Sequence, residues 1–271
     1  FGSKLLLSGL IDVFYKNVYY IVIGRYYSAT QLGQYTRAEQ FSTIFSSNLT
    51  SVVQRVSYPV LSSIQEEPER LRDAYRKIIK VTMLITFALM FGLAAIAKPL
   101  IVILIGEKWL MAVPFLQIIC FSEMLYPLHA INLNILQVRG YSGLFLKLEI
   151  VKKIIAVIPI MIGIFWGINY MLWGAVCISL VSYILNSYYS GRLIDYSTVK
   201  QVKDIFPCFL VSSLVALLMW GITFLHFNYW VTLLLQVSVG ILLAIVAYER
   251  MRLEEYKEIR RIILSIIRKN S

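Results

Sequence analysis

Two long stretches of the chain carry no charged residue. They run from Ile154 to Gly191 and from Ile205 to Tyr248, and each is long enough for two bilayer crossings by helices of about 20 residues. Each contains a turn-forming segment near its middle, at 166–170 and 226–230, where Trp and Tyr are typical of a membrane interface. The pattern therefore predicts four transmembrane helices after residue 150.

The remaining apolar runs bring the expected number of spans to eight. They are Leu5–Gly24, Ala38–Ser62, Ile78–Ala97, Leu110–Val138, Gly143–Phe165, Met171–Ser190, Pro207–Leu225 and Trp230–Tyr248. Pro127 lacks a backbone N–H and should kink the fourth span. Residues 98–106 are apolar but too short to cross, so they should extend the third helix or form an interfacial turn. The predicted fold class is an all-α polytopic membrane protein.

Two further segments are amphipathic. Residues 66–80 place Leu71, Tyr75 and Ile78 between charges, and residues 249–271 place an apolar stripe opposite Lys and Arg. We expect both to form helices in the headgroup plane, the alternative being ordinary solvated helices.

Composition excludes several classes of protein. Of the 271 residues, 59% are hydrophobic and 15% are charged, against roughly 45–50% and 25% in soluble domains. A soluble enzyme, a disordered tail, a disulfide scaffold and a nucleic-acid binder are all disfavoured. The three Cys lie in apolar runs and the two His are far apart, so neither a metal nor another cofactor is expected. Without a nucleophile elbow, a phosphate-binding loop or paired catalytic carboxylates, transport is favoured over catalysis.

The cations predict the orientation in the membrane. The chain has 26 Lys and Arg against 15 Asp and Glu, and most of the cations follow even-numbered spans or lie at the chain ends. The positive-inside rule then places both ends of the segment in the cytoplasm. Glu149, Lys152 and Lys153 are interpreted as the cytoplasmic end of the fifth span, with lysines that reach the headgroups.

Charged and amide side chains within the spans suggest a hydrated cavity. Asp12 and Lys16 are four residues apart, and Asn48 and Arg55 share a stripe of the second span. Ionised groups are costly at the bilayer centre, so they should face protein or water. Glu123 in the fourth span is a candidate for titration.

Structural interpretations of these residues remain open. Asp12 and Lys16 can neutralise each other, Arg55 can reach towards the boundary, and Glu123 can serve a helix contact. His129, beside the proline, is more often packed than part of a proton relay.

Several long segments resemble one transporter family. They are "FGSKLLLSGLIDVFYKNVYYIVIGRYYSATQLGQYTRAEQF" at 1–41, "SSNLTSVVQRVSYPVLSSIQ" at 46–65, "GLAAIAKPLIVILIGEKW" at 92–109 and "PLHAINLNILQVRGYSGLFLKLEIVKKI" at 127–154. These segments resemble the C-terminal half of Wzx-type, WzxC-like polysaccharide flippases of the multidrug/oligosaccharidyl-lipid/polysaccharide exporter superfamily. The resemblance covers residues 1–190 well and the last two spans less.

The resemblance implies a fourteen-helix, two-lobed, MATE-like exporter fold with alternating access. Residues 1–190 would be the C-terminal transport lobe of six helices, 191–248 two accessory helices, and 249–271 a cytoplasmic amphipathic tail. The first lobe would be missing, which agrees with a chain that starts at Phe1 without Met. The implied location is the bacterial inner membrane.

The implied activity is export of an undecaprenyl-pyrophosphate-linked oligosaccharide from the cytoplasmic to the periplasmic leaflet. Cations suit a pyrophosphate, because Arg offers a planar fork and Lys a point charge. The expected substrate contacts are Arg55, Lys16, Asn48, Gln54 and Asn17. The ion-coupling candidates are Asp12 and Glu123. The implied partners are membrane lipids, the missing lobe, and polysaccharide polymerase and export machinery, with no nucleic acid.

Two other functions remain open at this stage. A cation-coupled drug antiporter of the same superfamily would favour an acidic cavity for organic cations. A membrane scaffold of a polysaccharide assembly complex would not transport at all.

Overall fold

The computed structural model describes residue 6, residues 17–251 and residue 256, and every regular element in these residues is a helix. Residues 17–26 are helical. The elements that follow are α2 (Ala29–Ser63), α3 (Pro68–Ile105), η1 (Glu107–Trp109), α4 (Ala112–Glu123), α5 (Tyr126–Val138), α6 (Ser142–Ile155), α7 (Val157–Trp166), α8 (Ile168–Ile194), α9 (Thr198–Gly221), η2 (Ile222–Leu225) and α10 (Tyr229–Arg250). The chain is an all-α polytopic membrane protein, as expected.

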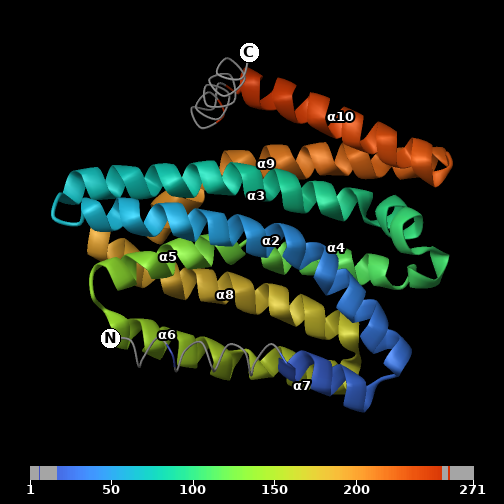
Figure 1. Cartoon of the computed structure of the whole chain (residues 1–271), viewed down its shortest axis with the longest axis horizontal. Helices are drawn as coiled ribbons and strands as arrows, with labels where there is room; N and C mark the ends of the chain where they lie inside the picture. The colour runs from blue at the N-terminus through green and yellow to red at the C-terminus, as the bar shows by residue number, and fades with distance from the viewer. Residues whose placement is uncertain (1–5, 7–16, 252–255, 257–271) are drawn as a thin grey trace.

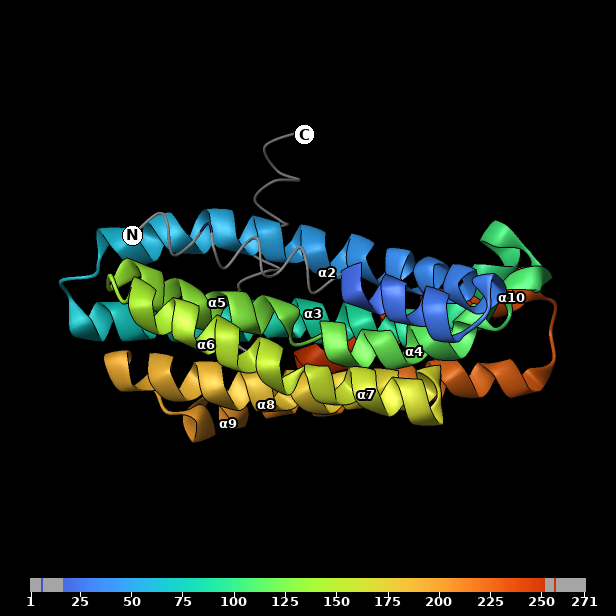
Figure 2. The ribbon, with the colours of Figure 1, turned by 90° about the horizontal axis from the view of Figure 1, so that it is seen from below.

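The helices lie side by side along one long axis (Figure 1). The connections at 64–67, 139–141 and 195–197 lie at one end, which we call the basic end because Arg and Lys flank them. The connections at 106–111 and 226–228 lie at the other end, which we call the aromatic end because Trp and Phe occur there. Figure 2 shows α2 along one side of the bundle and α8 and α9 along the opposite side.

Within the described residues, four helices are long and apolar enough to cross a membrane: α3, α8, α9 with η2, and α10. The expected second span lies in α2, which is long but rich in polar residues. The expected fourth and fifth spans are each divided, into α4 and α5 and into α6 and α7. The predicted kink is confirmed, because α4 ends before Pro127 and a new helix, α5, begins there. Pro127 lies in the first turn of α5, where the backbone N–H groups have no partner within the helix, so its missing N–H costs no hydrogen bond.

Helix α3 is central, and it packs against α2, α4, α5, α9 and α10. It continues through residues 98–105, so the first of the two expectations for this segment is correct. Pro99 removes the donor that would bond the carbonyl of Ala95, four residues earlier. Gln236 Nε2 of α10 lies 3.4 Å from this oxygen, and Gln117 Nε2 of α4 donates to the neighbouring Ala94 carbonyl at 3.2 Å.

The separate headgroup helix expected at 66–80 is wrong. These residues form the first turns of α3 and continue into the apolar part without a break. Leu71, Tyr75 and Ile79 are fully buried, because α9 packs along this part of α3. Most of the amphipathic tail expected at 249–271 lies outside the described residues.

An ion pair fastens α9 to α3 at the basic end. Arg76 Nε and Nη2 donate to the two oxygens of Asp204 at 2.5 and 2.8 Å, and the Tyr196 hydroxyl donates to Asp204 Oδ2 at 2.6 Å. Burial first, and then the Asp204 carboxylate, raises the pKa of Tyr196, so this phenol stays protonated as a donor. Such bidentate, charge-assisted pairs are the stronger class of hydrogen bond.

Asp204→Asn should lower the stability of the chain, because it removes the charge that both donors share. We expect a loss of about 1.5–3 kcal/mol, read as a lower midpoint of thermal unfolding in detergent. Asp195→Asn is the matched control, since Asp195 is 86% exposed and lies 3.7 Å from Arg72. Equal midpoints for the two variants would show that the Asp204 pair contributes nothing.

Candidate functional site

Helix α2 buries a face of small polar residues. Ser42, Ser46, Thr50 and Ser57 are all at most 4% exposed. Small side chains at this spacing let α2 approach α4 and α5 closely. Asn134 Nδ2 of α5 donates to Ser57 Oγ at 3.0 Å, which fixes the register of this contact.

The opposite face of α2 exposes a line of polar side chains, which we call the polar stripe. At 100° per residue they fall within one sector of the helix. The stripe consists of Arg37, Gln40, Ser47, Asn48, Gln54 and Arg55. Exposed Phe45, Val52 and Val56 lie beside it.

A polar stripe on a helix that runs beside membrane-spanning helices needs a polar environment wherever it enters the bilayer. Amide and guanidinium groups in hydrocarbon are costly, so the stripe must face water or another polar protein surface. Arg37 is already engaged, since its Nη1 donates to Gln40 at 2.8 Å and its guanidinium lies 5.4 Å from the centroid of the Trp109 ring. Within the described part of the chain, Arg55 makes no ion pair or hydrogen bond. The stripe is therefore the candidate binding surface.

The structure describes four of the five expected substrate contacts. Asn48, Gln54 and Arg55 are together on the polar stripe, and Asn48 Nδ2 donates to the Ile44 carbonyl at 2.7 Å. Asn17 is exposed at the start of the first described helix. Lys16 lies outside the described residues, as does the ion-coupling candidate Asp12.

Glu123 does not join the polar stripe. Its carboxylate accepts a hydrogen bond from Ser46 Oγ at 2.6 Å, on the buried face of α2. Helix α2 therefore separates Glu123 from Arg55. A second carboxylate, Glu39 of α2, accepts a hydrogen bond from the Tyr20 hydroxyl. Both carboxylates are partly buried between helices.

A nearly buried ion pair, which was not expected, lies on α6 at the edge of the bundle (Figure 1). Lys152 donates to Glu149, and the two side chains are 12% and 7% exposed. Both residues lie about midway between Ser142, where α6 begins, and Trp166, where α7 ends. Lys152 and Lys153 lie in the last turn of α6, as expected for a helix end, but Lys152 is paired and nearly buried, and α7 follows directly after Ala156. Their place near the middle of the predicted fifth span was the available signal.

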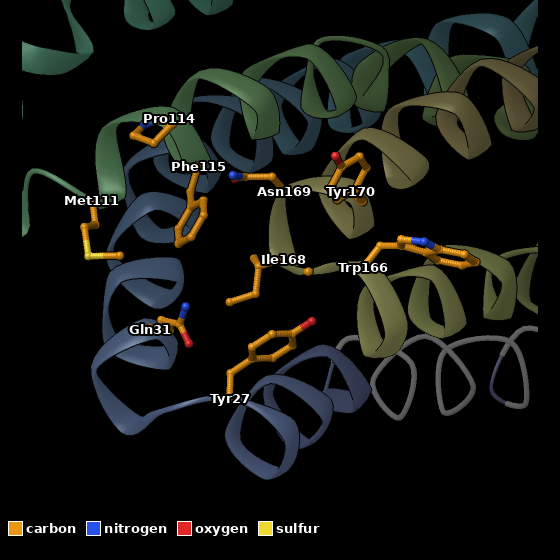
Figure 3. Close-up of a pocket in the computed structure, with 10 residues that line it drawn as sticks. Tyr27, Gln31, Met111, Pro114, Phe115, Trp166, Ile168, Asn169 and Tyr170 are labelled. Carbon is orange, nitrogen blue, oxygen red and sulfur yellow. The ribbon is translucent and has the colours of Figure 1, made fainter.

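A pocket of about 300 Å³ opens at the aromatic end (Figure 3). It lies where the start of α2, the start of α4 and the α7–α8 turn meet. Its lining combines aromatic rings with two amides, without an acidic or basic side chain: Tyr27, Gln31, Met111, Pro114, Phe115, Trp166, Gly167, Ile168, Asn169 and Tyr170. Such a pocket suits an uncharged, partly polar ring rather than an ion. The geometry thus separates a cationic stripe from a neutral pocket.

Comparison with known proteins supports one family. The profile of a polysaccharide biosynthesis protein family matches residues 1–114, which include the whole polar stripe. The chain is 25% identical over 243 residues to the teichuronic acid biosynthesis protein TuaB of Bacillus subtilis, covering 89% of this chain and 50% of that protein. The resemblance to polysaccharide flippases is confirmed.

Two further relatives are also named for polysaccharide biosynthesis or transport. One is the lipopolysaccharide biosynthesis protein WzxC of Escherichia coli, 25% identical over 60% of this chain and 33% of its own length. The other is the succinoglycan biosynthesis transport protein ExoT of Rhizobium meliloti, 31% identical over 38% of this chain and 21% of its own length. The chain therefore spans half or less of these relatives. No solved structure matches it significantly.

Proposed function

We propose that this chain is the second half of a flippase that moves an undecaprenyl-pyrophosphate-linked oligosaccharide across a bacterial inner membrane. The single observation that carries the proposal is the polar stripe of α2, an exposed line of amide and cationic groups on a helix of membrane-spanning length. Polysaccharide biosynthesis and transport relatives supply the substrate class.

In this proposal, Arg55 meets the pyrophosphate and the amides of the stripe meet phosphate or sugar. The Arg fork matches phosphate geometry, and Asn48 and Gln54 offer both donors and acceptors. Lys16 and Asn17 would extend the same surface from the first helix. The prenyl tail would remain in lipid, because only the head group needs a polar path.

The proposal needs a second lobe, which would face the polar stripe and close the cavity. The match to this chain covers only 50% of TuaB, which supports that arrangement. Residues 1–190 would form the transport lobe, and 191–248 the accessory helices that pack on α3. The basic end would face the cytoplasm, and the polymerase would receive the product on the other side.

Leaflet-resolved detection of the lipid-linked intermediate tests this function. Deletion of the full-length gene should leave the intermediate in the cytoplasmic leaflet, and complementation should restore its transfer. An intermediate that still reaches the outer leaflet after deletion would favour a scaffold. Drug sensitivity with normal polysaccharide in the deletion strain would favour an antiporter.

A further inference from the structure

The pocket at the aromatic end is built from three segments that are far apart in the sequence. They are the start of α2 with the turn before it, the start of α4 and the α7–α8 turn. Figure 3 shows the Phe115 ring and the amides of Gln31 and Asn169 around one open space. Phe115 and Ile168 are 5% and 4% exposed, whereas Gln31 is half-buried and Asn169 is exposed. The pocket therefore has an apolar floor and a polar rim.

Contacts between these segments hold the walls of the pocket in place. The Tyr27 hydroxyl donates a hydrogen bond to the Gly163 carbonyl of α7. Gln34 Nε2 of α2 donates to the Lys108 carbonyl at 2.8 Å, which ties α2 to the segment before α4. Helices α7 and α8 pack closely, because a Cβ atom at Gly163 would lie 2.7 Å from Met171 Cβ. A pocket with fixed walls binds a ring without first having to order its own side chains.

The rim of the pocket carries hydrogen-bonding groups that are open to a ligand. Gln31 Oε1 accepts from the Ser28 backbone N–H at 3.3 Å, but among the described residues Gln31 Nε2 and the Asn169 amide have no partner. No side chain of the described residues caps the start of α8, so the N–H groups of its first turn also remain open. Amides both donate and accept, and backbone N–H groups donate. The rim can therefore bind several hydroxyl groups of one ring.

The lining favours an uncharged ring with several hydroxyl groups. The described residues that line the pocket include no acidic or basic side chain, so a phosphate, carboxylate or ammonium group would enter it without a counter-charge. A sugar ring has C–H groups on its faces and hydroxyls around its edge. The C–H groups pack on the negative face of an aromatic ring, and the hydroxyls bind the amides. A volume of about 300 Å³ is at the small end of ligand sites, and it fits one ring better than a chain of rings.

The pocket is separate from the polar stripe. At 1.5 Å per residue, Gln31 lies about 36 Å from Arg55 along α2. At 100° per residue, it also lies about 120° around α2 from Arg37, the member of the stripe nearest to it in the sequence. The head group that meets Arg55 and the ring that enters the pocket are therefore different parts of a ligand.

We propose that this pocket is an exit-side subsite that binds one neutral sugar ring of the exported glycan. Tyr27 and Phe115 supply the apolar surface for the face of the ring, and Gln31, Asn169 and the first N–H groups of α8 bind its hydroxyls. Because the lining has no cation, a sugar with a carboxylate is bound less well, and the pocket contributes to the choice of glycan. That the ring belongs to a lipid-linked oligosaccharide rests on the proposed function, whereas the binding of a sugar ring does not.

Saturation-transfer difference NMR of the full-length protein in lipid nanodiscs tests the pocket, since a sugar-based detergent would compete for it. The neutral probes are the methyl β-glycosides of glucose, galactose and N-acetylglucosamine, and the acidic probe is methyl β-glucuronide. At least one neutral probe should receive saturation at its ring C–H protons and bind more tightly than the glucuronide. If no neutral probe is saturated, or if the glucuronide binds more tightly than all of them, the proposal is overturned.

Variants then locate the bound sugar. Phe115→Leu keeps an apolar side chain but removes the ring, and Asn169→Ala removes an amide; each should weaken binding of the neutral probe roughly two- to tenfold. Asn169 is exposed, so its variant remains informative if Phe115→Leu does not fold. Phe224→Leu is the control, because Phe224 is 61% exposed at the aromatic end and does not line the pocket. Binding by both pocket variants equal to that of the control would refute the site.

Binding of the lipid-linked substrate separates this proposal from the proposed function. Asn169→Ala should weaken binding of the oligosaccharide-linked lipid but not of undecaprenyl pyrophosphate without sugars, and equal losses for the two lipids would contradict a contact with the glycan. If the methyl glycosides bind as expected but the intermediate never crosses between leaflets, the pocket stands and the proposed function fails. If export proceeds and neither pocket variant alters sugar binding, the function stands and the pocket proposal fails.

Discussion

Arg55→Ala in the full-length transporter is expected to abolish surface polysaccharide while the protein still reaches the membrane. Arg55 is exposed on the polar stripe, about 12 Å from the basic end of α2 at 1.5 Å per residue. Loss of a charge-assisted contact worth about 1.5–3 kcal/mol should weaken binding of the pyrophosphate by roughly one to two orders of magnitude. Polysaccharide yield and binding of the lipid-linked substrate are the measurements.

Two variants make the Arg55 result interpretable. Arg55→Lys keeps the charge but loses the planar fork, so it should retain part of the activity. Arg192→Ala removes another exposed cation, on α8, whose guanidinium stacks on Tyr188, and should leave export unchanged. Wild-type export by Arg55→Ala would remove this residue from the mechanism, and equal losses in both alanine variants would indicate a general effect of charge.

The second large effect is expected at the Glu149–Lys152 pair. Glu149→Gln or Lys152→Met alone leaves one buried charge without its partner, which costs about 3–5 kcal/mol. We therefore expect each single variant to lose most of its folded protein at growth temperature, measured as the yield of monodisperse protein in detergent. The pair is a sensitive site because both side chains are nearly buried.

The double variant Glu149→Gln with Lys152→Met separates stability from transport. With no charge left in the interior, it should recover the folded yield. If the pair also takes part in transport, the recovered protein should bind substrate without exporting it. A double variant with full export would show that the pair only neutralises itself. Lys147→Met is the control, since Lys147 is an exposed lysine of the same helix.

Length and apolarity were enough to predict much of the fold. The first charge-free stretch corresponds to α7 and α8, and the second to α9 and α10. In lipid, an apolar segment can form all its backbone hydrogen bonds internally only as a helix. Pro127 marked the kink for a local steric reason. The break at Ala156 has no comparable signal, and the local pattern of residues 66–80 could not show that α9 covers them.

The candidate site was harder to predict, because a sequence gives the angular order of side chains but not which face is covered. The spacing of Asn48 and Arg55 placed them correctly on one stripe. It could not show that Glu123 of α4 binds Ser46 on the buried face of α2, away from the polar stripe. Glu149 precedes Lys152 and Lys153 by three and four residues, and this spacing is the same at the end of a helix and in its middle. Only the observed lengths of α6 and α7 show where along the bundle these three residues lie.

Pro99 has a wider consequence through the two glutamines beside it. The carbonyls around this proline are held from two directions, by α4 and by α10. The Arg76–Asp204 pair fixes α9 near the start of α3, and Gln236 fixes α10 near the end of α3. During a transport cycle we therefore expect α9 and α10 to move with α3 as one rigid body and not to slide across it as a gate.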